Sequence, residues 1–404
     1  MERDIRKQLE IIKRGAVEIF PEDELVKKLE RAIAQGKPLR VKQGFDPSAP
    51  DIHLGHTVGL RKMRQFQDLG HVAVVIIGDY TAMVGDPSGR SKTRPQLSHE
   101  QTMENAKSYL DQVRKVVSSD RLEVVFNGDW FAKMNLADIL KLTSKMTVAR
   151  MLERDDFALR FKDGSPIAVS EFLYPLMQGW DSVEIRADVE LGATEQKFNL
   201  LVGRALQADA GQEEQVCLTL PILPGTDGVR RMGKSLGNYI GISDVPFDMY
   251  GKVMSIPDSV MRQYFELITD LQMDEINALL SPQTHPRAAK AALAARVVEM
   301  YHGAPAARAA AEEFDRVFKN KDLPDDIPAV SLPAGIVRDG KVQIIDLLRE
   351  ARLVPSNSEA RRMVQQGAVS VDGTKIDSIE AAVAVADGTV VQVGKRKFAR
   401  VQIG

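Results

Sequence analysis

The feature that most restricts the fold of this chain is the run Val72-Ala73-Val74-Val75-Ile76-Ile77, which contains no polar side chain. A strand of this composition has to be covered on both faces, as in the parallel sheets of α/β proteins. A helix-period segment precedes the run, and another follows it over Ser98–Val117. Strands that alternate with helices predict a parallel sheet with right-handed crossovers. We therefore expect an α/β fold that binds its ligands at the carboxyl ends of the strands.

Upstream of this run lie a predicted strand, a turn and the start of a helix. Apolar residues alternate over Leu39–Phe45, as in a half-buried strand, and the two prolines of Asp46–Pro50 predict a turn. The helix-period pattern then begins at Leu54, and His53 and His56 share one face of its first turn because they lie three residues apart. Free N–H groups and the dipole at a helix N-terminus favour phosphate binding at this point.

Two other interpretations of the histidine pair stay open. Both rings could be exposed at a helix cap, as is common for an isolated His-x-x-His pair. A metal site needs further ligands, and no cysteine or third histidine lies nearby in the sequence, so we expect no metal there. Gly55, between the two histidines, leaves room for a flat or bulky ligand to approach the backbone.

A second candidate site is the polar stripe of Tyr174, Gln178 and Asp181. Spacings of four and three residues place the three side chains on one helical face, and apolar residues occupy the other. Such a stripe is usually solvated, but tyrosine, glutamine and aspartate together carry less charge than most solvated faces. The sequence leaves two interpretations, a solvent-facing surface and the lining of a pocket.

Two loops rich in glycine and positive charge follow predicted strands, at Gly85–Arg94 and Gly228–Asn238. Within the second loop, Gly228–Ser235 matches the phosphate-loop pattern G-x-x-x-x-G-K-S. That motif needs a helix that starts at its Lys-Ser pair, whereas Gly237 follows at once and opposes a helix. We therefore expect a mobile basic loop that reaches phosphates rather than a phosphate-loop NTPase.

Length and composition limit the class of protein. A chain of 404 residues predicts two or three domains. No stretch approaches the ~18–20 apolar residues of a membrane span, and the N-terminus lacks the apolar region of a signal peptide. A single cysteine, Cys217, suits a reducing compartment, so we expect a cytoplasmic protein with no membrane partner. Residues 341–404 hold ten Lys/Arg and seven Asp/Glu, which points to a polyanionic partner for this segment.

The remaining patterns divide the chain into parts. Residues 1–36, 136–162 and 247–318 read as helical, and an Asp-Gly turn at Asp372 predicts a hairpin in the C-terminal segment. The predicted organisation is a Rossmann-like parallel-sheet catalytic domain with a connective insertion at 1–240, an α-helical domain at 241–325, a linker at 326–341 and a small α+β domain at 342–404.

Two short motifs and the C-terminal segment give the chain a resemblance to a known family. His53-Leu54-Gly55-His56 looks like the HIGH signature of class I aminoacyl-tRNA synthetases, and Arg231-Met232-Gly233-Lys234-Ser235 looks like their KMSKS signature. Residues 342–404 are similar to an S4 RNA-binding domain. In this order, with about 180 residues between the two motifs, the chain resembles the bacterial tyrosyl-tRNA synthetases nearly from end to end.

This resemblance implies a two-step reaction. Tyrosine is activated by ATP, which arrives as its Mg²⁺ complex, and the tyrosyl group of the adenylate then passes to the 3′ end of tRNA(Tyr). The resemblance also implies a homodimer, a helical domain on the anticodon side of the tRNA, and no tightly bound metal in the protein. Chemistry of this kind needs positioning and charge stabilisation more than a covalent nucleophile.

The resemblance also assigns roles to residues. The catalytic residues are His53, His56, Arg231 and Lys234. The residues expected to contact ATP are Asp46, Ser48, His53, Gly55, His56, Gly192, Glu195, Met232, Lys234 and Ser235. Those expected to bind tyrosine are Gly44, Asp86, Tyr174, Gln178, Asp181 and Gln196, with Asp181 at the phenol hydroxyl. Arg90 and Arg94 match a mobile basic loop, and the residues expected to bind tRNA are Arg361, Arg362, Lys395, Arg396 and Lys397.

Several positions depart from the family pattern. They are Lys42 in place of a second phenol-binding tyrosine, Arg231 and Gly233 within the KMSKS-like motif, Ala193 and Glu195 within a segment that usually reads Gly-Gly-Thr/Ser-Asp-Gln, and Trp180 where tyrosine is common.

Three alternative functions compete with tyrosine charging. An adenylate-forming paralogue without tRNA activity conflicts with the basic tail. An RNA-binding protein without catalysis conflicts with the intact His53, His56 and Lys234. Tryptophan as the substrate conflicts with Asp181 as an acceptor for a phenol.

Overall fold

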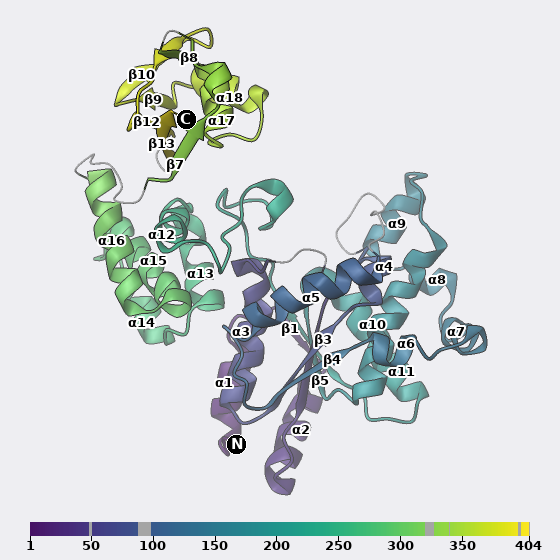
Figure 1. Ribbon diagram of the computed structural model, residues 1–404. Helices are drawn as coiled ribbons and strands as arrows, with labels where there is room; N and C mark the ends of the chain where they lie inside the picture. Colours follow the sequence, from purple (N-terminus) through teal and green to yellow (C-terminus); the bar gives the residue numbers. More distant parts are fainter. Residues whose placement is uncertain (48–50, 88–97, 320–326, 339, 395–396, 404) are drawn as a thin grey trace. The chain divides into compact units, whose positions relative to one another are not determined.

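The computed structural model describes residues 1–47, 51–87, 98–319, 327–338, 340–394 and 397–403. It consists of two compact units, residues 1–244 with 252–297, and residues 245–251 with 298–404 (Figure 1). Among the described residues, no helix is both long and apolar enough to cross a membrane. Five residues with an expected role lie outside the described residues, namely Ser48, Arg90, Arg94, Lys395 and Arg396.

The N-terminal unit is built on a six-stranded sheet with the order β1-β6-β5-β2-β3-β4. Its strands are β1 (Glu18–Phe20), β2 (Arg40–Phe45), β3 (Val72–Ile77), β4 (Leu122–Phe126), β5 (Val189–Ala193) and β6 (Val216–Leu220). The five strands β6, β5, β2, β3 and β4 run parallel, and the short β1 pairs antiparallel with β6. The α/β fold with a parallel sheet is confirmed.

The apolar run forms β3 as predicted, and five of its six residues are buried. Helix α3 (Leu54–Asp68) contacts this strand, while Val74 and Ile76 pack with Ile185 at the end of α10 (Leu173–Ile185). Figure 1 places α3 on one side of the sheet and α10 on the other. Because helices cover both faces, the strand can carry apolar side chains in both directions.

The prediction that residues 1–36 are helical is wrong at Glu18–Phe20. This segment forms β1, which pairs with β6 so that Phe20 lies opposite Cys217. Such a short edge strand carries no periodic pattern, and its pairing partner lies far away in the sequence. Helices α1 (Ile5–Lys13) and α2 (Glu22–Gln35) form most of the remaining segment, as expected.

Further helices connect the strands and extend beyond them. They are α4 (Thr81–Val84), α5 (His99–Val113), α6 (Gly128–Phe131), α7 (Leu136–Thr143), α8 (Val148–Met151), α9 (Asp155–Lys162), α11 (Lys197–Asp209), α13 (Met261–Ile268) and α14 (Met273–Leu279). Short 3-10 turns lie at η1 (Val169–Phe172), η2 (Thr194–Gln196), η3 (Lys234–Leu236) and η4 (Asp258–Val260). The predicted helical stretch 136–162 is divided into α7, α8 and α9, and the side chain of Thr147 caps the start of α8.

The division into two units does not coincide with the predicted helical domain at 241–325. Helices α13 and α14 belong to the N-terminal unit, and α13 contacts α3. Tyr264 and Phe265 of α13 are fully buried, so this helix adds to the core of the sheet domain. Two helices span the division, α12 (Pro246–Met254) and α15 (Pro286–His302), and α16 (Ala304–Lys319) follows in the C-terminal unit.

The C-terminal unit contains a five-stranded sheet with the order β10-β9-β12-β13-β7 and a separate pair of β11 with β8. The strands are β7 (Ala329–Leu332), β8 (Lys341–Gln343), β9 (Val369–Val371), β10 (Thr374–Ile376), β11 (Ala382–Ala384), β12 (Val390–Val393) and β13 (Lys397–Ile403). A 3-10 turn η5 (Ala334–Ile336) and two helices, α17 (Ile344–Glu350) and α18 (Asn357–Gln365), complete it.

One strand of this sheet corrects the predicted linker at 326–341. β7 lies inside that range and pairs in parallel with β13, with Val330 opposite Val401. The pairing partner lies near the end of the chain, so local sequence gave no sign of it. By contrast, the hairpin at Asp372-Gly373 is confirmed, and both turn residues have the positive φ that such a turn requires.

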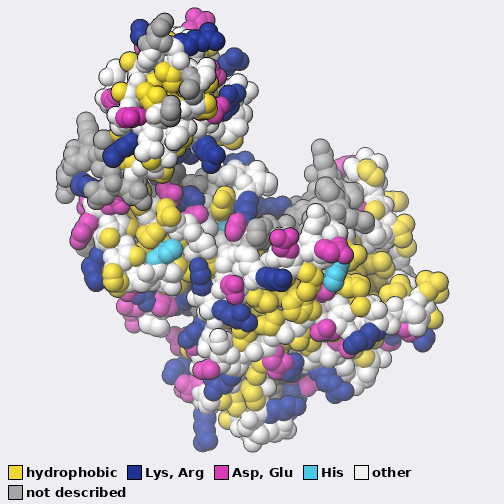
Figure 2. Space-filling model, viewed as in Figure 1, with side chains coloured by type: hydrophobic (Ala, Val, Ile, Leu, Met, Phe, Trp, Pro, Cys, Tyr) yellow, Lys and Arg dark blue, Asp and Glu magenta, His cyan; other side chains and the backbone are white. Residues whose placement is uncertain are grey.

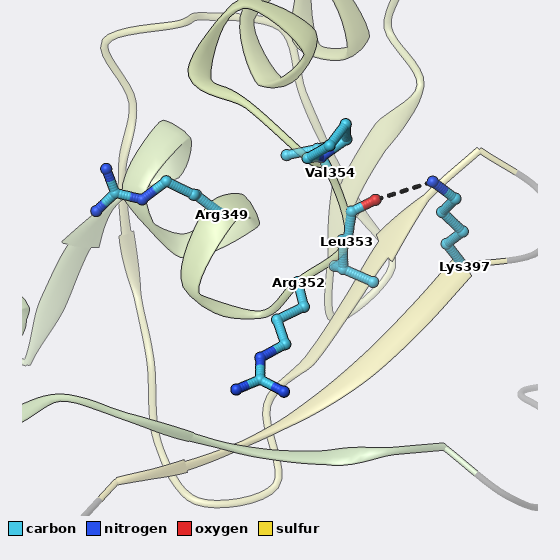
Figure 3. Close-up of a pocket in the computed structure, with 6 residues that line it drawn as sticks. Arg349, Arg352, Leu353, Val354 and Lys397 are labelled. Atoms are coloured by element: carbon cyan, nitrogen blue, oxygen red, sulfur yellow. Dashed lines mark hydrogen bonds between the residues drawn. The ribbon is translucent and has the colours of Figure 1, made fainter. Parts of the chain in front are cut away.

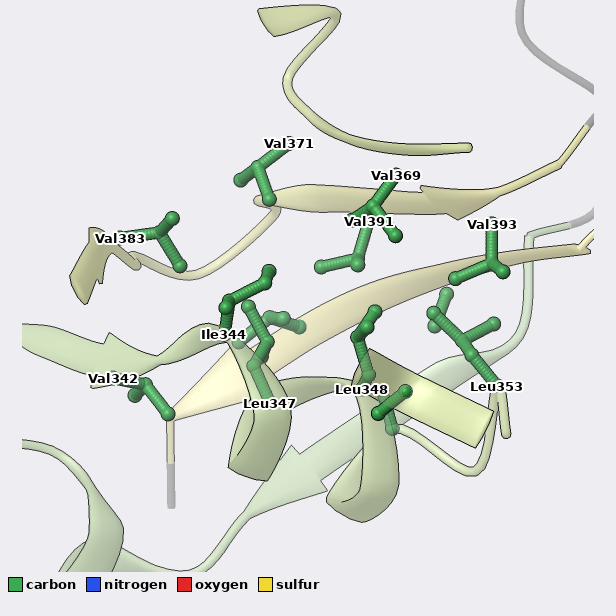
Figure 4. Close-up of a cluster of buried hydrophobic side chains, with 14 of the residues drawn as sticks. Val342, Ile344, Leu347, Leu348, Leu353, Val369, Val371, Val383, Val391 and Val393 are labelled. Atoms are coloured by element: carbon green, nitrogen blue, oxygen red, sulfur yellow. The ribbon is translucent and has the colours of Figure 1, made fainter. Parts of the chain in front are cut away.

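The core of the C-terminal unit lies between its helices and its sheet. Figure 4 shows Ile344, Leu347 and Leu348 of α17 against Val369 of β9 and Val391 of β12. All five side chains are almost fully buried. The elements α17, α18 and β13, which also carry basic side chains, pack together through this core.

Candidate active site

The first part of the candidate site lies at the carboxyl end of β2. Asp46 follows this strand directly, and its Oδ1 accepts a hydrogen bond of 2.8 Å from the Thr81 hydroxyl. Its Oδ2 accepts one of 2.8 Å from the Tyr174 hydroxyl. Asp46 therefore joins the ends of β2 and β3 to helix α10, as expected for a site at the carboxyl edge of a parallel sheet.

The two histidines lie at the N-terminus of α3, with their rings stacked 3.8 Å apart. The backbone N–H of His53 donates to Nδ1 of His56 at 3.3 Å. Since Nδ1 is the acceptor, the ring hydrogen of neutral His56 lies on Nε2 and makes that atom a donor. Nδ1 of His53 is buried and has no hydrogen-bond partner among the residues that the structure describes.

Both histidines are neutral near pH 7. Burial lowers the pKa of His53 to about 4 and that of His56 to about 3, and the positive charge of Lys234 acts in the same direction on both. His53 is only 7% exposed, so the interpretation of two exposed cap histidines is wrong. Neutral rings can donate hydrogen bonds to phosphate without a protonation step.

The second glycine-rich loop comes back to this helix N-terminus. The backbone N–H of Leu54 donates to the carbonyl of Ile240, just after this loop, at 2.9 Å. The Lys-Ser pair itself lies in the short 3-10 turn η3, which ends at Gly237 with φ 65°. Without an α-helix at that point, the phosphate-loop interpretation fails. Lys234 forms an ion pair with Asp51 at 2.7 Å.

Gly55 has a role that the sequence did not indicate. A Cβ atom at this position would lie 3.0 Å from the His53 ring and 3.4 Å from Cβ of Met232. The glycine therefore lets Met232 of the loop and the His53 ring lie close to the backbone, a role that adds to the expected approach of a ligand. Met232 is itself buried, whereas Ser235 is exposed.

The polar stripe of α10 is buried, which excludes the solvent-facing interpretation. Tyr174, Gln178 and Asp181 are 6%, 9% and 3% exposed. Oδ1 of Asp181 accepts a hydrogen bond from Nε1 of Trp130 at 3.1 Å, and Oδ2 accepts one from Nδ2 of Asn127 at 3.4 Å. Burial raises the pKa of Asp181 to about 7, although the positive charge of Lys42 opposes that shift.

Gln178 is part of a chain of hydrogen-bonded side chains, of which Asn199 and Arg154 were not expected from the sequence. Its Oε1 accepts from Nδ2 of Asn199 at 2.8 Å, and Oδ1 of Asn199 accepts from Arg154 at 3.0 Å. Arg154 also lies 3.7 Å from Asp86, whose Oδ2 accepts from Gln196 at 2.9 Å. Three predicted tyrosine-binding residues thus belong to one network.

Two further residues, from strands of the sheet, also belong to this network. Lys42 of β2 and Glu190 of β5 form an ion pair of 2.9 Å, and both side chains are completely buried. Glu190 also accepts from Nε2 of Gln178 at 3.0 Å. A glutamate in the otherwise apolar strand β5 is the signal that could have pointed to a buried partner of opposite charge.

Comparison with known protein families shows to which family the chain belongs. Residues 34–319 match the family described as tRNA synthetases class I (W and Y), and residues 320–401 match the C-terminal domain described as Tyrosine–tRNA ligase SYY-like. The chain belongs to the class I tRNA synthetases of the tryptophan and tyrosine group.

Relatives match the chain over nearly its whole length. It is 52% identical over 403 residues to a protein named Tyrosine–tRNA ligase from Carboxydothermus hydrogenoformans, covering 98% of each chain. It is 50% identical over 398 residues to a protein of the same name from Aquifex aeolicus, covering 98% of this chain and 99% of that one.

Two solved structures share the fold. A C-terminally truncated mitochondrial tyrosyl-tRNA synthetase from Aspergillus nidulans matches with a TM-score of 0.65 and 24% identity, covering 78% of this chain and 95% of that one. The tyrosyl-tRNA synthetase from Archaeoglobus fulgidus, in complex with L-tyrosine, matches with a TM-score of 0.60 and 23% identity, covering 76% of this chain and 100% of that one.

The departures from the family pattern have distinct surroundings in this synthetase. Glu195 lies 3.6 Å from Arg231, and burial raises its pKa. Trp180 donates a hydrogen bond to Glu184 at 2.8 Å.

Two glycines with an expected ligand contact differ in their surroundings. A Cβ atom at Gly192 would lie 2.7 Å from Leu200, so the end of β5 packs tightly, whereas Gly44 has open space beside it.

In the C-terminal unit, basic side chains gather in two places. Arg361 and Arg362 are exposed on α18, and Arg362 pairs with Glu359 at 2.5 Å. Lys397 belongs to a cleft of about 410 Å³ that also includes Arg349 and Arg352, which the sequence analysis did not select. Figure 3 shows this cleft, with Nζ of Lys397 bound to the Leu353 carbonyl at 3.1 Å.

No metal centre stands out in the part of the chain that the structure describes. There, no group of three or more His, Cys, Asp or Glu side chains is arranged to hold a metal ion.

Proposed function

We propose that this synthetase activates L-tyrosine with ATP and transfers the tyrosyl group to the 3′ end of tRNA(Tyr) for protein synthesis. A carboxylate oxygen of tyrosine attacks the α-phosphorus of ATP, and pyrophosphate leaves. The terminal ribose hydroxyl of the tRNA then attacks the tyrosyl carbonyl carbon, and AMP leaves. The observation that carries the choice of tyrosine is Asp181, a buried carboxylate on the same helical face as Tyr174 and Gln178.

In the first step, His53 and His56 donate hydrogen bonds to the phosphates, and Lys234 and Arg231 offset the charge that develops on the leaving pyrophosphate. Donors that are already oriented toward such charge lower the barrier without reorganising. Nδ1 of buried His53, which has no partner among the described residues, supports this role because a bound ligand can supply one. Asp46, Gly55, Gly192, Glu195, Met232 and Ser235 surround the nucleotide in this proposal.

In the amino-acid site, Asp181 accepts the phenol hydroxyl. A charged acceptor forms a stronger bond to O–H than a neutral one does. Gln178, Tyr174, Asp86 and Gln196 hold the ammonium and carboxylate, and Gly44 leaves space for the backbone of the ligand. Mg²⁺ enters with ATP as part of the substrate, bound by phosphate oxygens.

For the second step we propose that the C-terminal unit binds the tRNA backbone. Arg361, Arg362 and Lys397 match the expected contacts, and Arg349 and Arg352 extend the basic surface. Each lost phosphate contact lowers the slope of log affinity against log salt by roughly 0.7–0.9. Replacing Arg361 and Arg362 with alanine is therefore expected to weaken tRNA binding and its salt dependence while adenylate formation stays unchanged.

We also propose that two copies associate through the surface of helices α7, α8 and α9. Large apolar side chains are exposed on α7, α8 and α9, namely Leu136, Leu140, Val148, Leu159 and Phe161. Figure 2 shows hydrophobic side chains gathered over this part of the N-terminal unit. Contiguous apolar surface of this kind marks protein interfaces. The cytoplasm, where tRNA is charged and a lone cysteine stays reduced, is the proposed location.

ATP–pyrophosphate exchange, measured with each of the twenty amino acids, tests the proposed function. The expected result is exchange with tyrosine alone. Exchange with tryptophan instead, or with no amino acid at all, would overturn the proposal.

A further inference from the structure

A buried ion pair lies at the amino-acid end of the site. Lys42 of β2 and Glu190 of β5 are direct partners in adjacent parallel strands, and both side chains are 0% exposed. Taking two charges out of water is costly, and well-packed apolar residues often stabilise such a position equally well or better. The stability of the fold therefore does not account for this pair.

All the donors of Lys42 are bound within the protein. Its Nζ donates to the Gln178 carbonyl at 2.6 Å and to the Ser182 hydroxyl at 2.7 Å, besides its pairing with Glu190. An ammonium group has three donors and no acceptor. Lys42 consequently has no N–H left for a substrate, and it cannot replace a phenol-binding tyrosine by direct contact.

Glu190 collects hydrogen bonds from several side chains. Its Oε1 accepts from Nε2 of Gln178 at 3.0 Å, and its Oε2 accepts from the Ser182 hydroxyl at 3.3 Å and from Nε2 of Gln215. An ionised carboxylate can only accept hydrogen bonds. The amide group of Gln178 therefore has to turn its NH₂ toward Glu190.

The carbonyl oxygen of the Gln178 amide is held by a donor, which favours the same orientation of the amide. Arg154 can only donate, so it binds Oδ1 of Asn199 and leaves the NH₂ of Asn199 facing Oε1 of Gln178. An acceptor at one end of the chain and a donor at the other thus define both amide orientations. The carbonyl oxygen of Gln178 keeps a second lone pair, on the helical face that also carries Tyr174 and Asp181.

We propose that the Lys42–Glu190 pair positions Gln178 as an acceptor for the ammonium group of the amino acid. Glu190 holds the NH₂ of Gln178 away from the ligand, and Lys42 balances the charge of Glu190 in the buried site. The pair acts through Gln178 and touches no substrate atom. This inference rests on the proposed tyrosine activation and names the part of the site that recognises the α-ammonium.

The variant Glu190→Gln tests this role, because it keeps the size of the side chain but removes the charged acceptor that holds the NH₂ of Gln178, so that Asn199 alone orients this amide. The two probes are L-tyrosine and 3-(4-hydroxyphenyl)propionate, which lacks only the ammonium. The dissociation constant of L-tyrosine is expected to rise roughly 10- to 100-fold, as for loss of a hydrogen bond to a charged group. The dissociation constant of the propionate is expected to stay within twofold.

Gln67→Met serves as the matched control for loss of a buried polar group. Gln67 is a buried amide on α3, and its hydrogen bonds among the described residues go to Ser118, Asp120 and Arg121 rather than to the network around Gln178. This variant is expected to lower the melting temperature while the dissociation constants of both probes stay unchanged.

A second variant covers the case in which Glu190→Gln does not fold. The double variant Lys42→Met with Glu190→Met removes both charges together, which is tolerated far better than removing one. It is expected to fold and still to bind L-tyrosine weakly. Normal L-tyrosine binding by either variant, or equal losses for both probes, would overturn the proposal. Failure of both variants to fold would also overturn it, by showing a structural requirement.

These outcomes are separable from the fate of the proposed function. Absence of tyrosine-dependent exchange in the unmodified chain contradicts the proposed function. An active unmodified chain with unchanged L-tyrosine binding in the variants contradicts only the positioning role.

Discussion

The two halves of the candidate site are built from different kinds of contact. The phosphate half comprises His53, His56, Arg231 and Lys234, and the amino-acid half comprises Tyr174, Gln178 and Asp181 with the Lys42–Glu190 pair. In the phosphate half, Lys234 is 28% exposed and its partner Asp51 is 56% exposed. In the amino-acid half, Lys42 and Glu190 are both 0% exposed and each makes several hydrogen bonds.

This difference suits the two ligands. Exposed ion pairs contribute little stability and exchange partners easily, so the loop around Lys234 can follow phosphates whose charge changes during the reaction. A fully bonded buried network is rigid and specific. We therefore propose that the amino-acid half is preformed for one substrate, whereas the phosphate half rearranges as the reaction proceeds.

The largest expected effect comes from Asp181→Ala. A site built to bond a hydroxyl rejects an analogue without it by ~10⁴–10⁵, a range established on tyrosine-specific synthetases themselves. We expect the variant to lose nearly all tyrosine activation, while phenylalanine activation changes much less, because only tyrosine loses a bond. Exchange kinetics with both amino acids, together with a melting curve, check this prediction. Equal losses for the two amino acids and a lower melting temperature would indicate a purely structural role.

His56→Ala should have the next largest effect, on the rate of adenylate formation. Removing one preorganised donor typically lowers kcat by roughly 10²–10³. The KM for tyrosine is expected to stay nearly constant, since His56 belongs to the other half. Rapid-quench measurement of tyrosyl-adenylate separates the two constants. A rise in KM for tyrosine at unchanged kcat would contradict the division into halves.

The sequence allowed much of each half to be predicted, but for different reasons. The phosphate half depends on local motifs, and the stripe of Tyr174, Gln178 and Asp181 follows from helical spacing within one element. Glu190 and Lys42 could not be paired in advance because their contact depends on the register of two strands that are distant in sequence.

Elements that depend on distant pairing were missed for the same reason. β1 and β7 each add a short strand to a sheet through a partner far along the chain. Their own residues carry no periodic signal, so a helix and a linker were predicted instead. Strands with an apolar run or an alternating pattern of their own, such as β3 and β2, were predicted correctly.

The two halves should respond to pH in opposite directions. Burial raises the pKa of Asp181 from 3.8 to about 7, so in this interval the folded chain holds a proton that the unfolded chain has released. Raising the pH through the interval therefore lowers stability. Burial lowers the pKa of His53 from 6.5 to about 4, and there the unfolded chain holds the extra proton, so raising the pH increases stability.

Melting temperatures of Asp181→Asn and His53→Asn, each compared with the unmodified chain, check both signs. The melting temperature of Asp181→Asn, relative to that of the unmodified chain, is expected to rise as the pH increases from about 3.8 to about 7. The relative melting temperature of His53→Asn is expected to fall as the pH increases from about 4 to 6.5. If the relative melting temperatures of both variants changed in the same direction with pH, the predicted opposite pH responses of the two halves would be contradicted.

The smallest effect is expected from Gly233→Ser in the loop of the phosphate half. Gly233 has an extended backbone with φ −167°, and the nearest atom to an added Cβ is 3.8 Å away, on Leu236. Substitutions without steric conflict usually change free energies by less than ~0.5 kcal/mol, so the KM for ATP should change less than about twofold. Gly55→Ser is the contrasting variant, since its Cβ meets the His53 ring at 3.0 Å. An equal effect of both variants on exchange kinetics would contradict this reading of the loop.

The independence of the two halves is tested most directly by the dissociation constant of L-tyrosine without ATP, measured by titration of Lys234→Met and the unmodified chain. Because Lys234 pairs with Asp51 in the phosphate half, its loss leaves the buried network around Asp181 and Gln178 intact. Equal dissociation constants are predicted, alongside a much slower formation of tyrosyl-adenylate by the variant. A tenfold weaker binding of L-tyrosine to Lys234→Met would contradict the account.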